Sequence, residues 1–246
     1  FYFVDFLLSH YDSDGLVKYL IDHCEILIVP MINPDGVEFN IANYPDGGGM
    51  WRKNRRQIEK DKFGVDLNRN FSAYWGFDNL GSSPFPGDED YRGEYPMSEY
   101  ELQSLEALFQ EYFFNRALFL HSYGNCVLFP YSYNALQTAN HEEFLTIAKE
   151  MAKENNYQYG FPNQILGYSA NGSSDDYAYD IFGTFSYTLE IGTRLDGFWP
   201  AAMRVPFLTK KTLPAMFALL KSILPTPVIV KNDLFGTFTA DSCKDF

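Results

Sequence analysis

Short apolar runs alternate along this chain with segments of helical periodicity, and this alternation restricts the possible folds more than any other feature. Runs typical of strands occupy residues 25–31, 117–120, 126–129, 184–191 and 228–230. Segments typical of amphipathic helices occupy residues 3–10, 14–21, 98–112, 142–156, 173–182 and 206–223. Strands that alternate with helices predict an α/β fold, and the continuous apolar run at 25–31 predicts a central strand buried on both faces.

Capping and turn residues predict where several of these elements begin. Asp14 is placed to cap the second helix, and Ser98 has the spacing of a capping box with Glu101. Residues 33–36 have turn chemistry and are expected to follow the first strand. In the last helix, Pro214 is expected either to kink the helix or to lie in its first turn.

The composition excludes several classes of protein. With 246 residues, 46% of them hydrophobic, the chain can build the core of one large domain. Its net charge of −13 argues against a nucleic-acid partner, which requires a basic face. No apolar run approaches the roughly 20 residues that span a bilayer. The scattered cysteines Cys24, Cys126 and Cys243 do not suit a disulfide framework and are expected to be buried as small apolar groups.

Residues 43–96 form a loop-rich stretch that carries two clusters of arginine and asparagine. The first lies at residues 51–56, and the second contains Asn68 and Arg69. A loop of this length inside a compact domain is usually functional, and guanidinium groups bind planar carboxylates through two-point contacts. One interpretation is therefore a site that holds a carboxylate. The other is a solvated loop whose arginines pair with nearby acids.

Two further polar residues stand at the ends of apolar strands. His121 follows the run at 117–120, where a histidine can be a metal ligand but is more commonly a hydrogen-bonded structural residue. Glu190 lies near the end of the run at 184–191, where burial would raise its pKa and suit it to accept a proton. The alternative for Glu190 is a strand end that emerges into solvent. No His-Glu-x-x-His, His-x-x-Glu or Cys-x-x-Cys spacing occurs, so the sequence contains no complete metal site.

Five motifs, in order, resemble those of the zinc metallocarboxypeptidases of the carboxypeptidase A/B type. They read Asn-Pro-Asp-Gly from residue 33, Trp-Arg-Lys-Asn-Arg from 51, Gly-Val-Asp-Leu-Asn-Arg-Asn-Phe from 64, Leu-His-Ser-Tyr from 120 and Thr-Leu-Glu from 188. Each motif alone is weak, but their order and spacing match from about residue 1 to residue 223. The resemblance implies an α/β/α sandwich around a mixed, mostly parallel, twisted sheet that lacks its N-terminal strands here.

The resemblance also implies roles for individual residues. His121 resembles a ligand of the single zinc ion, and Glu190 resembles the general base. Arg52 resembles the group that polarises the scissile carbonyl. Asn68 and Arg69 resemble the clamp on the terminal carboxylate of the substrate. The implied reaction is the zinc-dependent removal of single residues from the C-termini of peptides or proteins.

Further matched positions concern the walls of the site. Tyr168 resembles the mobile tyrosine that closes over the bound substrate, and Ser122 and Tyr123 resemble substrate-contacting residues. Cis peptide bonds are implied at 122–123 and 130–131. Asp175 falls where the family sets the floor of its side-chain pocket, as in the B-type pattern that pairs an Asp with C-terminal Lys or Arg. The other interpretation of Asp175 is an ordinary acidic residue in the first turn of a helix.

The resemblance to the family does not extend to the remaining metal ligands. In the family they come from a His-x-x-Glu motif, which this chain lacks, so two of the expected zinc ligands are absent. We expect that motif in an N-terminal segment or pro-segment of the same gene product, and a secreted or lumenal location, lysosome or vacuole included. Residues 1–224 are then an N-terminally incomplete catalytic region, and 225–246 a C-terminal extension. The alternative is an inactive binding or scaffold domain that recognises C-terminal carboxylates.

Overall fold

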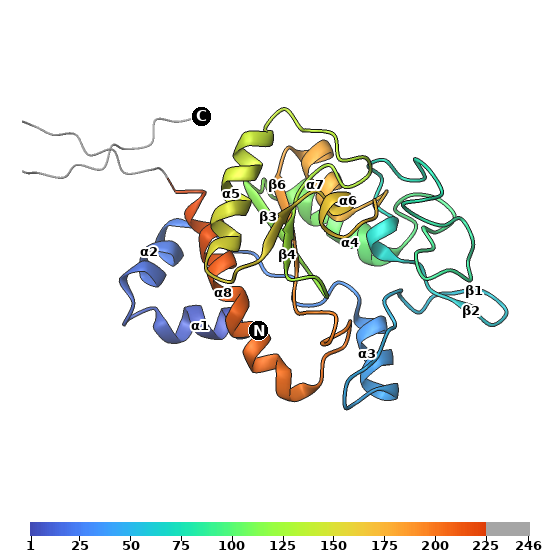
Figure 1. The fold of residues 1–246 in the computed structure, drawn as a ribbon, viewed down its shortest axis with the longest axis horizontal. Helices are drawn as coiled ribbons and strands as arrows, with labels where there is room; N and C mark the ends of the chain where they lie inside the picture. The colour runs from blue at the N-terminus through green and yellow to red at the C-terminus, as the bar shows by residue number, and fades with distance from the viewer. Residues whose placement is uncertain (225–246) are drawn as a thin grey trace, which may run out of the picture.

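The computed structural model describes residues 1–224, and at its centre lies a four-stranded mixed sheet (Figure 1). Its strands are β3 (Arg116–His121), β4 (Cys126–Leu128), β5 (Gln158–Gly160) and β6 (Phe185–Glu190), in the order β3-β6-β4-β5. β3 is parallel to β6, β4 is antiparallel to β6, and β5 is parallel to β4. Three of the predicted strands and the α/β fold are therefore confirmed. The run at 228–230 lies outside the described residues.

Helices cover both faces of this sheet (Figure 1). On one face, α5 (His141–Lys153) and α8 (Val205–Lys221) enclose a core that includes Tyr187 and Leu189 of β6. On the other face, α4 (Tyr100–Glu111) and α7 (Ser174–Phe182) enclose a core that includes Phe119 of β3. Because successive strand residues point to opposite faces, each strand supplies side chains to both layers.

The first 43 residues contribute α1 (Tyr2–His10), α2 (Gly15–His23) and α3 (Pro34–Asn43). Asp14 caps α2 as predicted, because its carboxylate accepts hydrogen bonds from the first-turn amides. The turn predicted at 33–36 is wrong, since Asn33 accepts a hydrogen bond from Gly36 N and begins α3. Asparagine followed by proline is a signal for a helix start as well as for a turn, and the helix prevails here.

The predicted start of one other helix, α4, also needs correction. Ser98 does not form a capping box, because its hydroxyl contacts the side chains of Asn70 and Glu99 and α4 begins at Tyr100 without a side-chain cap. Ser173 occupies the N-cap position of α7, but its side chain makes no capping hydrogen bond. Pro214 lies inside α8, not in its first turn.

The apolar run at residues 25–31 is not a strand, contrary to the prediction. It has no ladder partner within residues 1–224, and Leu27, Ile28 and Val29 are exposed. An apolar run becomes a strand only where a neighbouring backbone completes its hydrogen bonds. Here the run and β3 border the same cavity of about 720 Å³, and β3 pairs only with β6 in the described part of the chain.

The loop-rich stretch predicted at 43–96 is largely irregular. It contains a short antiparallel pair, β1 (Gln57–Glu59) and β2 (Lys62–Phe63), and a turn of 3₁₀ helix, η1 (Leu67–Arg69). Two further short elements, α6 (Pro162–Ile165) and η2 (Ala202–Arg204), lie later in the chain. No helix within residues 1–224 has the length and apolarity that a membrane crossing requires.

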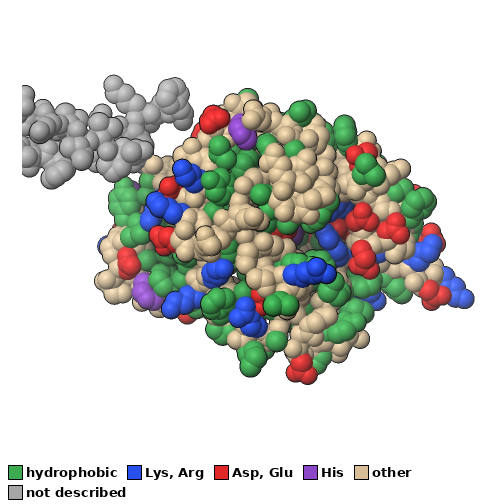
Figure 2. Space-filling model, in the orientation of Figure 1, with side chains coloured by type: hydrophobic (Ala, Val, Ile, Leu, Met, Phe, Trp, Pro, Cys, Tyr) green, Lys and Arg blue, Asp and Glu red, His purple; other side chains and the backbone are tan. Residues whose placement is uncertain are grey.

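The cysteines and the surface charge complete this description. Cys126 is buried as predicted, whereas Cys24, which follows the last turn of α2, is partly exposed. Cys243 lies outside the described residues. Acidic and basic side chains are interspersed over the face shown in Figure 2, so the net negative charge is not gathered into one patch there.

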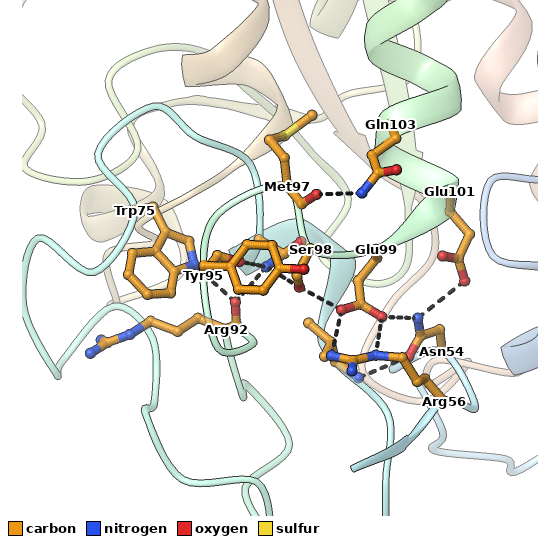
Figure 3. Close-up of polar contacts among 12 residues, drawn as sticks. Asn54, Arg56, Trp75, Arg92, Tyr95, Met97, Ser98, Glu99, Glu101 and Gln103 are labelled. Carbon is orange, nitrogen blue, oxygen red and sulfur yellow. Dashed lines mark hydrogen bonds and ion pairs between the residues drawn. The ribbon is translucent and has the colours of Figure 1, made fainter.

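An ion pair with the buried carboxylate of Glu99 fastens the irregular stretch to the start of α4 (Figure 3). Arg56 donates from Nε and Nη2 to the two carboxylate oxygens of Glu99 at 2.9 and 2.8 Å. Asn54 Nδ2 donates to the same carboxylate at 2.7 Å. Glu99 is only 1% exposed, so its charge depends on these three donors and on the hydroxyl of Ser98 in place of water.

We expect Glu99→Ala to lower the free energy of unfolding by about 2 kcal/mol, because it leaves Arg56 without its acceptor and Asn54 Nδ2 with only its longer hydrogen bond, to Glu101 Oε1 at 3.1 Å. The expected cost is below that of a fully buried pair because the Arg56 side chain is 42% exposed. Urea denaturation measures it. The control is Glu59→Ala, which removes the exposed pair with Lys62 and should change stability by less than about 0.5 kcal/mol. Equal effects of the two variants would contradict the structural role of Glu99.

Candidate active site

The carboxyl-terminal ends of β3 and β6 place His121 and Glu190 side by side. They are register partners in the parallel ladder, and such partners project from the same face of a sheet. This face is the one covered by α7, since Ser186, four residues before Glu190, donates to the Asp175 carbonyl at 2.6 Å. On the other side of Glu190, its register partner is Cys126 of β4.

Glu190 is enclosed rather than solvated. Its side chain is 9% exposed, so the strand does not simply emerge into solvent at this point. Burial raises the pKa of its carboxyl group to about 7, although the positive charges of Arg52 and Arg69 act in the opposite direction. A carboxyl group with this pKa can both accept and release a proton near neutral pH.

His121 is held in its neutral form. Burial, and then the positive charge of Arg52, lower its pKa to about 4. Neutral imidazole is the form that binds metal ions. Within residues 1–224, however, no group of three or more His, Cys, Asp or Glu side chains could hold a metal ion. Since catalytic zinc takes three protein ligands, the residues present do not form a zinc site by themselves.

Arg52 is positioned by Asp66, a residue without an expected role in the site. Arg52 Nη2 lies 2.8 Å from Asp66 Oδ2, and the charge of the buried Asp66 raises the pKa of the guanidinium. Asp66 Oδ1 also accepts a hydrogen bond from Asn68 N at 3.1 Å, which begins η1. The signal that could have identified Asp66 is its isolation as the one acid among the apolar residues 65–67.

Asn68 and Arg69 lie together on η1, against the N-terminus of α7. Asn68 Oδ1 accepts a hydrogen bond from Ser174 N at 2.8 Å, and Arg69 Nη1 donates to the Asn68 carbonyl at 2.7 Å. Arg69 is 5% exposed, and burial lowers its pKa. Its Nε has no hydrogen-bond partner within residues 1–224. A buried guanidinium with an unused donor is suited to binding an anion.

Gly172 makes this close approach of η1 and α7 possible. Its φ is +65°, and a Cβ atom on it would lie 2.4 Å from the carbonyl oxygen of Arg69. Its own carbonyl accepts a hydrogen bond from Phe71 N at 3.1 Å. Only glycine fits both the left-handed backbone and the limited space. The Asn-Arg motif and the acidic start of α7 are therefore joined through a backbone contact.

Two adjacent buried carboxyl groups, those of Asp175 and Asp176, lie in the first turn of α7. Ser132 Oγ donates to Asp175 Oδ2 at 2.7 Å. Asp176 accepts hydrogen bonds from Ser132 N at 2.7 Å and Tyr133 N at 3.1 Å. Burial and the charge of Asp175 raise the pKa of Asp176 well above its usual range. Ser132 could not be identified from the sequence, because no local pattern links it to a residue 43 positions away.

Tyr168, Ser122 and Tyr123 lie at the edge of this arrangement. Tyr168 is 47% exposed, as a residue at a cavity mouth can be. Ser122 Oγ donates to the Phe198 carbonyl at 2.9 Å, and the rings of Tyr123 and Phe198 are 5.2 Å apart. The peptide bonds at Ser122-Tyr123 and Pro130-Tyr131 are both cis, as the family resemblance implied.

The nine residues singled out in the sequence all line one cavity, the same one that extends along β3. They are Arg52, Asn68, Arg69, His121, Ser122, Tyr123, Tyr168, Asp175 and Glu190. The solvated-loop interpretation of the arginine clusters does not describe Arg52 and Arg69, because both line this cavity and Arg69 is buried. The structure thus brings together residues that lie up to 138 positions apart in the sequence, from 52 to 190.

Comparison with solved structures shows that the chain has a carboxypeptidase fold. Bovine thrombin-activatable fibrinolysis inhibitor, in complex with tick carboxypeptidase inhibitor, superimposes with a TM-score of 0.80 at 29% identity, covering 90% of this chain and 75% of that chain. A carboxypeptidase A from Helicoverpa armigera gives a TM-score of 0.67 at 25% identity, covering 89% and 55%. These similarities define the class of protein: the chain has the α/β fold of peptidases.

The zinc carboxypeptidase family model matches residues 1–215, and the chain belongs to this family. Carboxypeptidase O of Bos taurus is 31% identical over 234 residues, which cover 90% of this chain and 60% of the relative. Carboxypeptidase B of Rattus norvegicus is 33% identical over 199 residues, which cover 77% and 46%. The chain therefore spans about half the length of the curated relatives that it matches.

Proposed function

We propose that this chain supplies the larger part of the catalytic unit of an exopeptidase that removes single C-terminal residues and prefers Lys or Arg. The observation that carries the proposal is the buried Arg69 guanidinium, which lines one cavity with Glu190 and His121. Such a guanidinium binds a carboxylate through two hydrogen bonds. Because a main-chain carboxylate occurs only at the end of a peptide, this contact selects terminal over internal bonds.

The remaining residues fit the steps of such a reaction. Glu190 takes the proton of the attacking water, since its pKa of about 7 suits it to act as a base. Arg52, held by Asp66, faces the charge that develops on the scissile carbonyl oxygen. Asn68 adds a second polar contact to the substrate carboxylate, and Tyr168 covers the bound end.

The proposal includes one zinc ion, which the described residues do not hold by themselves. His121 would be one of its ligands, and two more would come from residues outside the printed sequence. Bound zinc would supply Lewis-acid chemistry at the scissile carbonyl. A secreted or lumenal location and an N-terminal segment or pro-segment belong to the same proposal. Top-down mass spectrometry of the protein from its natural source tests it, because fragment ions that contain a His-x-x-Glu motif are the expected result.

The proposed preference for Lys or Arg is supported by the residues that line the cavity wall. Its apolar part includes Leu128, Pro162 and Leu166, and its polar part includes Ser132 and Asp175. Lys and Arg side chains have this same distribution, with an apolar stem and a cationic head. A buried carboxylate at the polar part would therefore pair with the head while the stem packs against the wall.

A second candidate function is favoured by the single imidazole of the site. Without two additional ligands the cavity would still bind a C-terminal carboxylate through Asn68 and Arg69, but it would not hydrolyse the peptide. Such a protein would be a binding or scaffold domain. The absence of a three-residue metal cluster within residues 1–224 is the observation that supports this alternative.

Three peptides tested on the protein expressed from its complete gene distinguish these functions. They share one sequence and end in Arg, in Leu or in Arg amide. We expect release of the C-terminal residue from the two acids, faster for Arg, no cleavage of the amide, and one zinc ion per molecule by elemental analysis. Binding of the acids without zinc or cleavage would support the second function. Equal binding or equal cleavage of the Arg peptide and its amide would contradict both functions.

A further inference from the structure

Ser132 and Tyr133 donate hydrogen bonds to both acidic residues in the first turn of α7, of which Asp175 lines the cavity. Ser132 contacts Asp175 through its hydroxyl and Asp176 through its amide, each at 2.7 Å. The amide of Tyr133 donates to the second oxygen of Asp176 at 3.1 Å. The segment 131–133 lies on the surface of the domain, since Tyr133 itself is only partly buried. The position of 131–133 is therefore linked to that of the Asp175 carboxylate through the Ser132 hydroxyl.

Tyr74 holds this segment from the outside. Its ring stacks on the ring of Tyr133, with centroids 3.7 Å apart and an angle of 11° between the planes. It also meets the ring of Tyr131 edge-on at 5.5 Å. Aromatic pairs in these geometries add to the contact energy of the apolar surfaces. The segment is thus enclosed between Tyr74 on one side and the two carboxyl groups on the other.

Hydrogen bonds close this arrangement back onto α7. The hydroxyl groups of Tyr74 and Tyr131 both donate to Asp180 Oδ1, each at 3.2 Å. Burial raises the pKa of Tyr131 to about 12 and raises that of Tyr74 as well, so both hydroxyls remain protonated donors. Asp180 lies four residues after Asp176, one turn further along the same helix. These contacts therefore link α7 to residues 131–133, link those residues to Tyr74, and link Tyr74 back to α7.

The backbone of Tyr74 indicates that this contact is enforced. Its φ is +53°, in the left-handed region that bulky residues rarely adopt. The residue also lies five positions after Arg69, in the segment that leaves η1. Tyr74 therefore connects the part of the chain that carries Asn68 and Arg69 with the part that carries Ser132.

We infer that Tyr74 is a positioning residue for selectivity: it fixes the Ser132–Asp175 contact relative to Asn68 and Arg69, so that a cationic C-terminal side chain meets Asp175 while its carboxylate meets Arg69. The inference rests on the proposed exopeptidase function. It goes beyond that function in assigning the selection of Lys and Arg partly to a residue that does not line the cavity.

The test compares Tyr74→Ala with Tyr74→Phe in the protein expressed from its complete gene. We expect Tyr74→Ala to speed amide hydrogen exchange at Ser132 and Tyr133 about tenfold, with no change at Tyr187 in β6. The ratio of kcat/KM for Arg-terminated over Leu-terminated peptides should fall about tenfold, mainly through a higher KM for the Arg peptide. Tyr74→Phe keeps the stack and should stay within about threefold of the wild type in both measurements.

The control is Tyr100→Ala, which removes an exposed tyrosine on α4 and should alter neither measurement. Unchanged exchange and an unchanged ratio in Tyr74→Ala would overturn the inference. So would an equal loss on both peptides with faster exchange throughout the chain, because that result describes general destabilisation. If the wild type cleaves neither peptide, the proposed function fails and the selectivity role fails with it. The exchange rates at Ser132 and Tyr133 then still decide whether Tyr74 supports the segment.

Discussion

Replacing Glu190 with Gln is expected to lower kcat/KM for an Arg-terminated peptide about 1,000-fold, with little change in KM. The reason is that Gln keeps the shape of the side chain but cannot take the proton of the attacking water. Hydrolysis of the peptide by wild type and variant measures the effect. Glu142→Gln, the same change at an exposed residue of α5, should leave activity unaltered. A Glu190→Gln variant with more than about a tenth of the wild-type rate would show that another group is the base.

The same variant should be more stable than the wild type at high pH in the metal-free protein. The folded-state pKa of Glu190 is raised from 4.5 to about 7, mainly by burial, so the folded state binds more protons than the unfolded state between these values. Stability due to this group therefore falls as pH rises through that window, by at most about 3 kcal/mol. Urea denaturation in the presence of a chelator should give equal stabilities near pH 4.5 and a more stable variant at pH 8. A more stable wild type at pH 8 would contradict the burial of the charge.

Three strands could be predicted from the sequence because their segments are apolar. The runs that become β4 and β6 are buried, whereas β3 is only partly buried and its Leu120 is 51% exposed. The run at 25–31 has the same composition but forms no strand, because strand formation requires a neighbouring backbone as well as apolar side chains. The composition of a segment shows whether its side chains are apolar, but not whether a neighbouring backbone is available to pair with it.

The residues of the candidate site also fall into two groups, those that could be identified from the sequence and those that could not. His121 and Glu190 could be identified because a polar residue at the end of an apolar strand is conspicuous, and Arg69 because it lies in a distinctive motif. Ser132 and Tyr74 could not, since their contacts join segments 43 and 106 residues apart. Such contacts depend on how the elements pack, and no periodicity or spacing within one segment reports them.

Replacing Asp175 with Asn is expected to lower kcat/KM for an Arg-terminated peptide about 100-fold, or about 2.7 kcal/mol, and to leave a Leu-terminated peptide within about threefold. Asp175 is buried and its carboxylate is held by Ser132, so a cationic head that pairs with it does so away from water. Asn keeps the shape of the side chain and removes only the charge. The measurement is kcat/KM for two peptides that differ only in the last residue.

The comparison of the two peptides is what separates a role in selectivity from a role in folding. A structural role for Asp175 would reduce both rates together, whereas loss of a charge partner reduces only the rate for the cationic residue. Asp35→Asn, at an exposed position in the first turn of α3, removes the same charge from the molecule and should change neither rate. If Asp175→Asn still prefers Arg as strongly as the wild type does, the preference arises elsewhere in the cavity. If the wild type has no preference, the exopeptidase proposal stands without its basic selectivity, because the Arg69 contact does not depend on the side chain of the substrate.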